Sequence, residues 1–378
     1  MSESNPPSSH NSDASSGGSL SGFPEEDLRT DGRNNPGYFP ARLGQPLQQG
    51  RYCIVRKLGW GQYSSVWLAK DRGEDRFVAL KILTCEATKA LSSDENQRSD
   101  EQRMLEKIAT AEPSHRGFSH SLAYFGSFDF NGPHGLHRCI VTEVLGYSID
   151  YLRKLNDTDR RVAPSIVKRV VKQVLLGLEY LHNVCGIVHT DLKHDNILFR
   201  PLDLAGQDLV AVIADVGHSH WKNRHFQELV QPDALRAPEV ILGHLWGPPA
   251  DIWNLGCLVT ELLIGFWLFE PNKTDLWGYE EDHLARMTEA LDLHFETTML
   301  ANSAHRDKYF KADGKLAIVP NISIISFNIH DRILLQSFSE LGDDTPRAEE
   351  FLRRCLQLAP DKRATATELI NDPWLAIA

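Results

Sequence analysis

The stretch His189-Thr190-Asp191-Leu192-Lys193-His194-Asp195-Asn196, with Asp215-Val216-Gly217 further along, is the part of this chain from which the rest is best interpreted. Asp191 offers a carboxylate that could orient and deprotonate a hydroxyl, and Lys193 a cation that could balance charge on a moving phosphate. Asn196 and Asp215 offer the oxygen ligands that magnesium prefers. Any single Asp could equally be a turn or capping residue, so the prediction of phosphoryl transfer depends on the remainder of the chain.

Composition bounds the class of protein. A chain of 378 residues with 42% hydrophobic and 24% charged residues can bury a large core, and its length favours two lobes or domains plus tails. The net charge of −11 makes the whole protein a poor binder of polyanions, so we expect no direct contact with nucleic acid and a preference for basic partners.

The cysteines and the apolar runs indicate the compartment. No CxxC or Cys/His ligand spacing occurs among the cysteines, so we expect reduced thiols and neither a disulfide framework nor a zinc site. These are Cys53, Cys85, Cys139, Cys185, Cys257 and Cys355. No apolar run approaches the ~18 residues of a transmembrane helix, and the N-terminus lacks an apolar signal core. We expect a soluble monomer without a membrane partner, cytoplasmic and also nuclear.

Residues 1–36 are rich in Ser, Asn, Gly, Pro and acidic residues and contain almost no large apolar ones. Such a segment cannot bury enough surface to offset its ordering entropy, so we predict a disordered tail. It is either passive or regulated by phosphorylation. Residues 37–376 then form the folded domain, with an N-lobe at about 51–145 and a C-lobe at about 146–376. We expect order to begin near Arg51.

A glycine pair and a lysine mark the N-lobe. Tyr52–Leu58 is typical of a strand, and Gly59-Trp60-Gly61 begins a tight turn into a second strand that runs to Ala69. Glycines let a backbone approach phosphates closely, although a GxG in a hairpin is more often only a turn. The apolar strand Phe77–Leu83 carries Lys81, which favours the phosphate-binding interpretation.

A lysine inside an apolar strand needs a partner, because a buried unpaired charge is costly. Residues from about Glu95 to Ile108 have helical spacing and contain several acids. The candidate partners are Glu95, Asp100, Glu101 and Glu106. The alternative is that these acids form a solvated helix face.

The remaining pattern predicts two strands and then a mainly helical region. The strands are Leu122–Phe130 and Arg138–Val144. Apolar residues recur at helical spacing from Pro164 to His182, which predicts a long amphipathic helix leading to the polar stretch. Short strands are expected after this stretch, at Ile197–Phe199 and at Val210–Ala214, and the second leads into Asp215.

Taken together, residues 50 to 376 resemble a eukaryotic protein kinase of the serine/arginine-rich protein kinase group, within the class that includes cyclin-dependent and MAP kinases. Asn196 follows Asp191 at the spacing of that family's catalytic loop. Asp100-Glu101-Gln102-Arg103-Met104-Leu105 matches the register of the family's helix C, which implies that Glu101 is the partner of Lys81. The other matching motifs are Leu58-Gly59-Trp60-Gly61, Val66-Trp67-Leu68-Ala69, Ala214-Asp215-Val216-Gly217, Ala237-Pro238-Glu239, Ala250-Asp251-Ile252-Trp253, Leu268-Phe269-Glu270-Pro271 and Glu281-Asp282-His283-Leu284. The resemblance implies an α+β, bilobal fold with a small N-lobe β-sheet, a helix C and a larger, mainly helical C-lobe.

The resemblance also implies roles for individual residues. Asp191 and Lys193 would be catalytic, and Asn196 and Asp215 would hold Mg²⁺. ATP would lie against Leu58, Gly59, Gly61, Val66, Ala79, Lys81, Glu101, Glu143, Leu145 and Leu198, with Thr142 as a small gatekeeper residue. The substrate would be serine or threonine in a protein, with arginine/serine-rich basic proteins as the expected partners.

Structural roles follow in the same way. Glu239 would pair with Arg363 to brace the substrate-binding loop, and Asp251 would anchor the backbone of the catalytic loop.

The chain departs from this group at several positions. It leaves no room for a long spacer between Asn196 and Asp215, and Pro232 replaces a threonine that steadies the catalytic aspartate and lysine. Asp282 and Glu289 lie where the group holds basic docking peptides. They form either an acidic docking site or a plain solvated helix face.

Two other functions compete with protein phosphorylation. A pseudokinase-type scaffold would bind nucleotide without efficient turnover, and Pro232 is its main support. A small-molecule kinase is disfavoured by Ala237-Pro238-Glu239 and by the long helical C-terminal region.

We predict activity without phosphorylation of the activation loop. Many kinases order this loop by pairing a loop phosphate with an arginine beside the catalytic aspartate. Here Thr190 occupies the position of that arginine, and Ser219 is the only hydroxyl residue between His218 and Arg236. Protein made in bacteria should therefore keep its activity after phosphatase treatment. Loss of activity on treatment would contradict the prediction.

Overall fold

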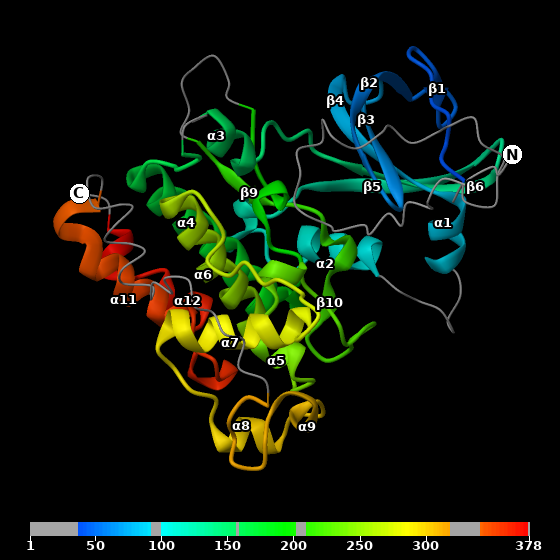
Figure 1. Ribbon diagram of the computed structural model, residues 1–378. Coiled ribbons are helices and arrows are strands. Elements are labelled where there is room, and N and C mark those ends of the chain that lie inside the picture. The colour runs from blue at the N-terminus through cyan, green and yellow to red at the C-terminus, as the bar shows by residue number, and fades with distance from the viewer. Residues whose placement is uncertain (1–36, 92–99, 156–158, 202–208, 318–340, 377–378) are drawn as a thin grey trace, which may run out of the picture.

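The computed structural model describes residues 37–91, 100–155, 159–201, 209–317 and 341–376. An antiparallel sheet forms a small lobe, and a larger, mainly helical lobe carries the rest of the chain (Figure 1). The predicted α+β bilobal architecture is confirmed. The tail at 1–36 lies outside the described residues.

The small lobe is built on a six-stranded sheet in the order β1-β2-β3-β4-β6-β5. Its strands are β1 Pro46–Leu47, β2 Tyr52–Gly61, β3 Ser64–Asp71, β4 Arg76–Leu83, β5 Tyr124–Gly132 and β6 Gly135–Thr142. The first long strand extends past the predicted end at Leu58, because Gly59 and Gly61 pair with β3 and only Gln62 and Tyr63 form the turn.

The lobe begins earlier than expected. Order was predicted near Arg51, but Phe39 is 5% exposed and lies in the same apolar cluster as Ile54 and Leu80. Its ring meets Phe130 edge to face, with 4.8 Å between ring centroids. The segment that precedes β2 is therefore part of the small-lobe core.

The large lobe surrounds one long buried helix. In α6 (Pro248–Ile264), fifteen consecutive residues from Ala250 onward are buried, as expected for a mainly apolar helix with other elements packed on every side. The other α-helices within the described residues are α1 Cys85–Leu91, α2 Glu101–Thr110, α3 Ile149–Leu155, α4 Pro164–Glu179, α5 Pro238–Ile241, α7 Tyr279–Leu291, α8 Thr297–Ala301, α9 Arg306–Tyr309, α11 Thr345–Cys355 and α12 Ala366–Leu369. None of the described helices is both long and apolar enough to cross a membrane.

Two predicted helices differ in extent from those observed. The described part of helix C, α2, begins at Glu101, and residues 95–99 of the prediction lie outside the described residues. The helix predicted to reach His182 ends as α4 at Glu179, and Tyr180–Cys185 continues it as a wider π-helical turn. Short strands β7 Ile187–Val188, β8 Ile197–Phe199, β9 Ala211–Ile213 and β10 His220–Trp221 frame the polar loops that follow.

Asp251 on α6 anchors the catalytic loop, as predicted. Its carboxylate accepts the backbone N–H groups of His189 and Thr190, each at 2.7 Å, and the His182 ring at 2.8 Å. Burial alone would raise the pKa of Asp251, but the hydrogen bonds from His182 and His189 outweigh burial and lower it. The loop is therefore fixed to the most buried helix of the molecule.

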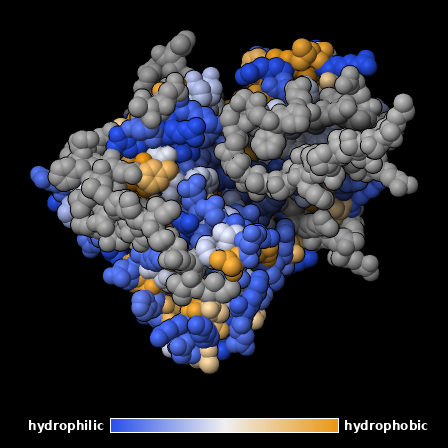
Figure 2. Space-filling view, in the orientation of Figure 1, coloured by the Kyte–Doolittle hydropathy of each residue, from blue (hydrophilic) through white to orange (hydrophobic). Residues whose placement is uncertain are grey.

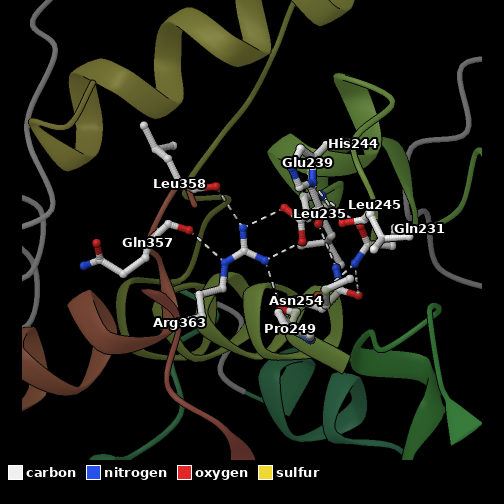
Figure 3. A network of polar contacts seen from close by, with 12 residues as sticks. Gln231, Leu235, Glu239, His244, Leu245, Pro249, Asn254, Gln357, Leu358 and Arg363 are labelled. Atoms are coloured by element: carbon white, nitrogen blue, oxygen red, sulfur yellow. Dashed lines mark hydrogen bonds and ion pairs between the residues drawn. The ribbon is translucent and has the colours of Figure 1, made fainter. Parts of the chain in front are cut away.

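The predicted ion pair between Glu239 and Arg363 is also present. The Arg363 guanidinium donates to both carboxylate oxygens, at 2.5 and 2.7 Å, and both side chains are fully buried. Figure 3 shows the remaining guanidinium N–H groups directed at the carbonyl oxygens of Gln357, Leu358 and Pro249. Such complete hydrogen bonding is what makes a buried pair tolerable.

Glu239→Ala should lower the free energy of unfolding by ~3–5 kcal/mol, because it leaves the Arg363 guanidinium buried without its counter-charge. Urea denaturation would measure the loss. The matched control is Glu296→Ala, which removes an exposed ion pair with Lys362 and should change stability little. Equal effects of the two substitutions would contradict the prediction.

Candidate active site

Lys81, Glu101 and Asp215 meet where the two lobes join. The Lys81 ammonium lies 2.7 Å from Glu101 Oε1 and 2.8 Å from Asp215 Oδ1. Lys81 comes from β4, Glu101 is the first residue of α2, and Asp215 follows β9. Glu101 is only 7% exposed, so the predicted ion pair is present and the solvated acidic face is wrong for this residue.

These charges stabilise one another. Burial would lower the pKa of Lys81, but the two carboxylates outweigh burial and raise it above its ordinary value. The Lys81 ammonium in turn holds the pKa of Asp215 well below its usual range, despite the opposing effect of burial. Near neutral pH the lysine is therefore charged and Asp215 is ionised.

The backbone beside Asp215 is adapted to this cluster. Asp215 has φ 58°, in the left-handed region, and its side chain accepts the N–H of Gly217. A Cβ at Gly217 would lie 3.1 Å from Asp215 Oδ1, 3.2 Å from Lys81 Nζ and 3.3 Å from Glu101 Oε2. Glycine is needed at this position because all three charged groups crowd it.

The catalytic loop groups the other predicted residues. Lys193 Nζ lies 3.0 Å from Asp191 Oδ2, and the Asn196 amide donates to the same oxygen and to the Asp191 carbonyl, both at 2.8 Å. His189 accepts the Asp191 N–H and contacts the Ala214 carbonyl at 3.0 Å. His189 therefore links the catalytic loop to the strand that delivers Asp215.

The glycine-rich turn shares a sheet face with the lysine. Gly59 pairs with Val66, and Val66 pairs with Lys81, so all three lie on one face across three strands. Ala79 lies two residues before Lys81 on the same face. A Cβ at Gly59 or Gly61 would meet nothing within 4 Å, so the space beside these glycines suits a ligand.

The segment joining the lobes holds the other predicted nucleotide contacts. Thr142 ends β6 opposite Ala79 and is buried. The side chain of Glu143 is bound by Arg200, at 2.7 and 2.9 Å, and its backbone N–H donates to the Ala123 carbonyl at 3.0 Å. Leu58, Leu145 and Leu198 are half-buried. The residues where the surface is hollowed between the lobes are mainly hydrophilic (Figure 2).

The site suits magnesium held jointly with phosphate. Asn196 donates through its amide nitrogen, so its other terminal atom is an oxygen of the kind that magnesium prefers. Both hydrogen bonds to the Asp215 carboxylate fall on Oδ1, which leaves Oδ2 for a cation. No group of three or more His, Cys, Asp or Glu side chains among the described residues could hold a metal by itself, so phosphate oxygens would complete the coordination.

The segment after Asp215 is held without a phosphate. Thr190 Oγ1 donates to the His218 carbonyl at 2.7 Å, and Ser219, 1% exposed, donates to the His189 carbonyl at 3.1 Å. Trp221 donates to Asp100, directly before helix α2, at 2.9 Å. Ser219 is thus closed to modification in this conformation, and the indole bond joins the segment to the helix that carries Glu101.

The altered segment before Ala237 is braced by Gln231, which sequence reasoning missed. Gln231 donates to the Ala250 carbonyl and to Asn254 Oδ1, both at 2.9 Å, and accepts the Ala237 N–H at 2.8 Å. Figure 3 shows Gln231 and Asn254 beside the Glu239 network. No local pattern marked this glutamine, because its partners lie on α6. It keeps the segment ordered although Pro232 lacks a hydroxyl.

Asp282 on α7 differs from both interpretations offered for it. Asp282 is 1% exposed, accepts the Asn272 N–H at 2.8 Å and pairs with Arg286 at 2.6 Å. It is neither a solvated residue nor a free docking carboxylate. Glu289 is half-buried.

Two lobes that bring this lysine, these carboxylates and this catalytic loop together define a protein kinase. The family model for the protein kinase domain matches residues 52–375. The crystal structure of a kinase domain superposes with a TM-score of 0.71 at 23% identity, over 90% of this chain and 99% of the other.

The sequence relatives are more specific. The serine/threonine-protein kinase SRPK of Physarum polycephalum is 32% identical over 94% of this chain and 92% of its own length. Protein kinase dsk1 of Schizosaccharomyces pombe is 28% identical over 90% and 83%, and SRSF protein kinase 3 of Mus musculus is 23% identical over 90% and 88%. The chain belongs to the protein kinase family, in its serine/arginine-rich protein kinase group, and is a serine/threonine protein kinase.

Gly217→Ala should lower kcat about ten- to a hundredfold, because a Cβ displaces the crowded charges by fractions of an ångström. Steady-state phosphorylation assays would measure it, with melting temperature as a check on folding. The matched control is Gly247→Ala, where the backbone is extended and the space is open. Wild-type kcat in Gly217→Ala would contradict the assigned crowding.

Proposed function

We propose that this chain transfers the γ-phosphoryl group of Mg-ATP to serine or threonine within arginine-rich, basic protein segments. The observation that carries the transfer is the set of charged contacts joining Lys81 to Glu101 and Asp215, with Asp191 and Lys193 paired nearby.

Each residue has a role in the proposed transfer. Asp191 orients the substrate hydroxyl and accepts its proton, and Lys193 stabilises the charge on the transferring group. Lys81, fixed by Glu101, positions the nucleotide. Asn196 and Asp215 would hold magnesium, which when bound neutralises negative charge on the phosphate oxygens.

The basic substrate preference is supported by charge near the substrate-binding segment. The net charge is −11, and Glu280 and Glu281 open α7. Burial and the nearby Asp233 carboxylate raise the pKa of Tyr279, the first residue of α7, to about 12, so the start of this helix lies close to the segment before Ala237. The mouse relative is itself named an SRSF protein kinase.

A scaffold that binds nucleotide without turnover is the alternative, and Pro232 favours it because a hydroxyl near the catalytic pair is missing. In this structure Asn196 holds the Asp191 carboxylate instead. A scaffold without turnover does not require the pairing of Lys193 with Asp191, so we favour the active enzyme.

The deciding experiment is a peptide-library phosphorylation screen with the full chain and Mg-ATP. We expect phosphate on serine or threonine, with arginine enriched around the modified residue and acidic peptides unmodified. Asp191→Asn should abolish most turnover while the thermal shift by Mg-ATP stays near that of the wild type.

Each other outcome has a distinct meaning. A thermal shift without incorporation in any peptide would favour the scaffold. Incorporation without basic preference would leave the kinase but overturn the substrate class.

A further inference from the structure

Tyr38 reaches the tip of the glycine-rich turn from a segment outside the sheet. Its hydroxyl lies 2.6 Å from the Gly61 carbonyl and 3.0 Å from the Gln62 carbonyl. One hydroxyl hydrogen can be shared between two such acceptors. The contact therefore restrains the backbone of the turn itself and does not depend on a turn side chain.

Both neighbours of Tyr38 are anchored in the small lobe. Gly37 accepts the N–H of Cys85 at 3.0 Å, and Phe39 is buried against Phe130. Gly37 has φ +81°, and a Cβ there would come 2.9 Å from the Cβ of Cys85. Only glycine allows this close approach. We call Gly37–Phe39 the strap.

Anchoring makes an otherwise weak hydrogen bond effective. The bond is exposed, and an exposed tyrosine would normally lose rotamer entropy to make it. Here the buried neighbours on both sides already fix the backbone of Tyr38. The restraint therefore acts mainly on the turn.

The turn is the element that needs restraint. Gly59 and Gly61 have open space around them, so nothing packs against the turn from their side. The Thr84 N–H donates to the Tyr63 carbonyl at 2.9 Å, and the Tyr63 ring lies 6.4 Å from the His218 ring. Tyr38 adds hydrogen bonds to Gly61 and Gln62, the two residues before Tyr63.

We propose that Tyr38 is a positioning residue for phosphoryl transfer, which holds the glycine-rich turn down over the phosphates of ATP. The proposal rests on the proposed function in that ATP must bind beneath this turn. Tyr38 touches neither nucleotide nor substrate and acts through the carbonyl oxygens of Gly61 and Gln62.

The test is Tyr38→Phe in the full chain, which keeps the ring and removes the donor. The KM for ATP should rise about two- to tenfold, the range for one lost hydrogen bond, while the KM for a basic peptide stays constant. Hydrogen exchange should accelerate in peptides covering residues 58–66 and nowhere else. The control is Tyr52→Phe, which removes a hydroxyl from a buried tyrosine at the other end of β2.

A second variant displaces the strap without removing the hydroxyl. Gly37→Ala places a Cβ against Cys85 at positive φ and should raise the KM for ATP in the same way. The proposal is overturned if Tyr38→Phe matches Tyr52→Phe in both KM values and in exchange. It is also overturned if the melting temperature and kcat fall and both KM values change together, since that pattern marks a purely structural residue.

The exchange measurement separates this proposal from the proposed function. A wild-type chain that phosphorylates nothing would refute the function. Faster hydrogen exchange at residues 58–66 in Tyr38→Phe would still support the proposal that Tyr38 restrains the glycine-rich turn, and unchanged exchange would refute it.

Discussion

The fold depends on one ammonium group held between two carboxylates. Lys81 lies in an apolar strand, where a lone charge would be prohibitively costly, and both Glu101 and Asp215 are needed to compensate for its burial. One partner belongs to a helix of the small lobe and the other follows a strand of the large lobe. The same attraction that makes the lysine tolerable therefore fixes helix α2 against the sheet and sets one lobe against the other.

The same rule applies to two other buried charges, because Asp251 and Arg363 are both hydrogen-bonded. Asp251 accepts backbone N–H groups of the catalytic loop, and Arg363 donates to Glu239 and to a backbone carbonyl group. Thr190 and Trp221 hold the segment after Asp215 with neutral donors. Neutral hydrogen bonds need no added phosphate, so order in this segment is a property of the unmodified chain.

The sequence allowed us to predict residues whose burial requires a partner of opposite charge. A lysine in an apolar strand requires an acid. That requirement alone left several acids open, and the resemblance of residues 100–105 to the family's helix C assigned Glu101. Tyr38 and Gln231 require no such partner, because a hydroxyl or an amide is well solvated by water. The residues next to them in the sequence do not reveal a distant partner. The prediction for Asp282 was wrong because an acid in a charged helix suggests exposure. Its carboxylate is in fact buried, with Asn272 and Arg286 as partners.

The departures from the kinase group fall outside the reacting groups, and the geometry explains why they are tolerable. Asn196 serves twice, since its amide nitrogen holds the Asp191 carboxylate and its oxygen is left for a metal. Gln231 meanwhile fixes the neighbouring segment to α6. Asp191 and the segment before Ala237 are thus held by different residues, so the sequence of that segment can change while the Asp191 carboxylate stays in place.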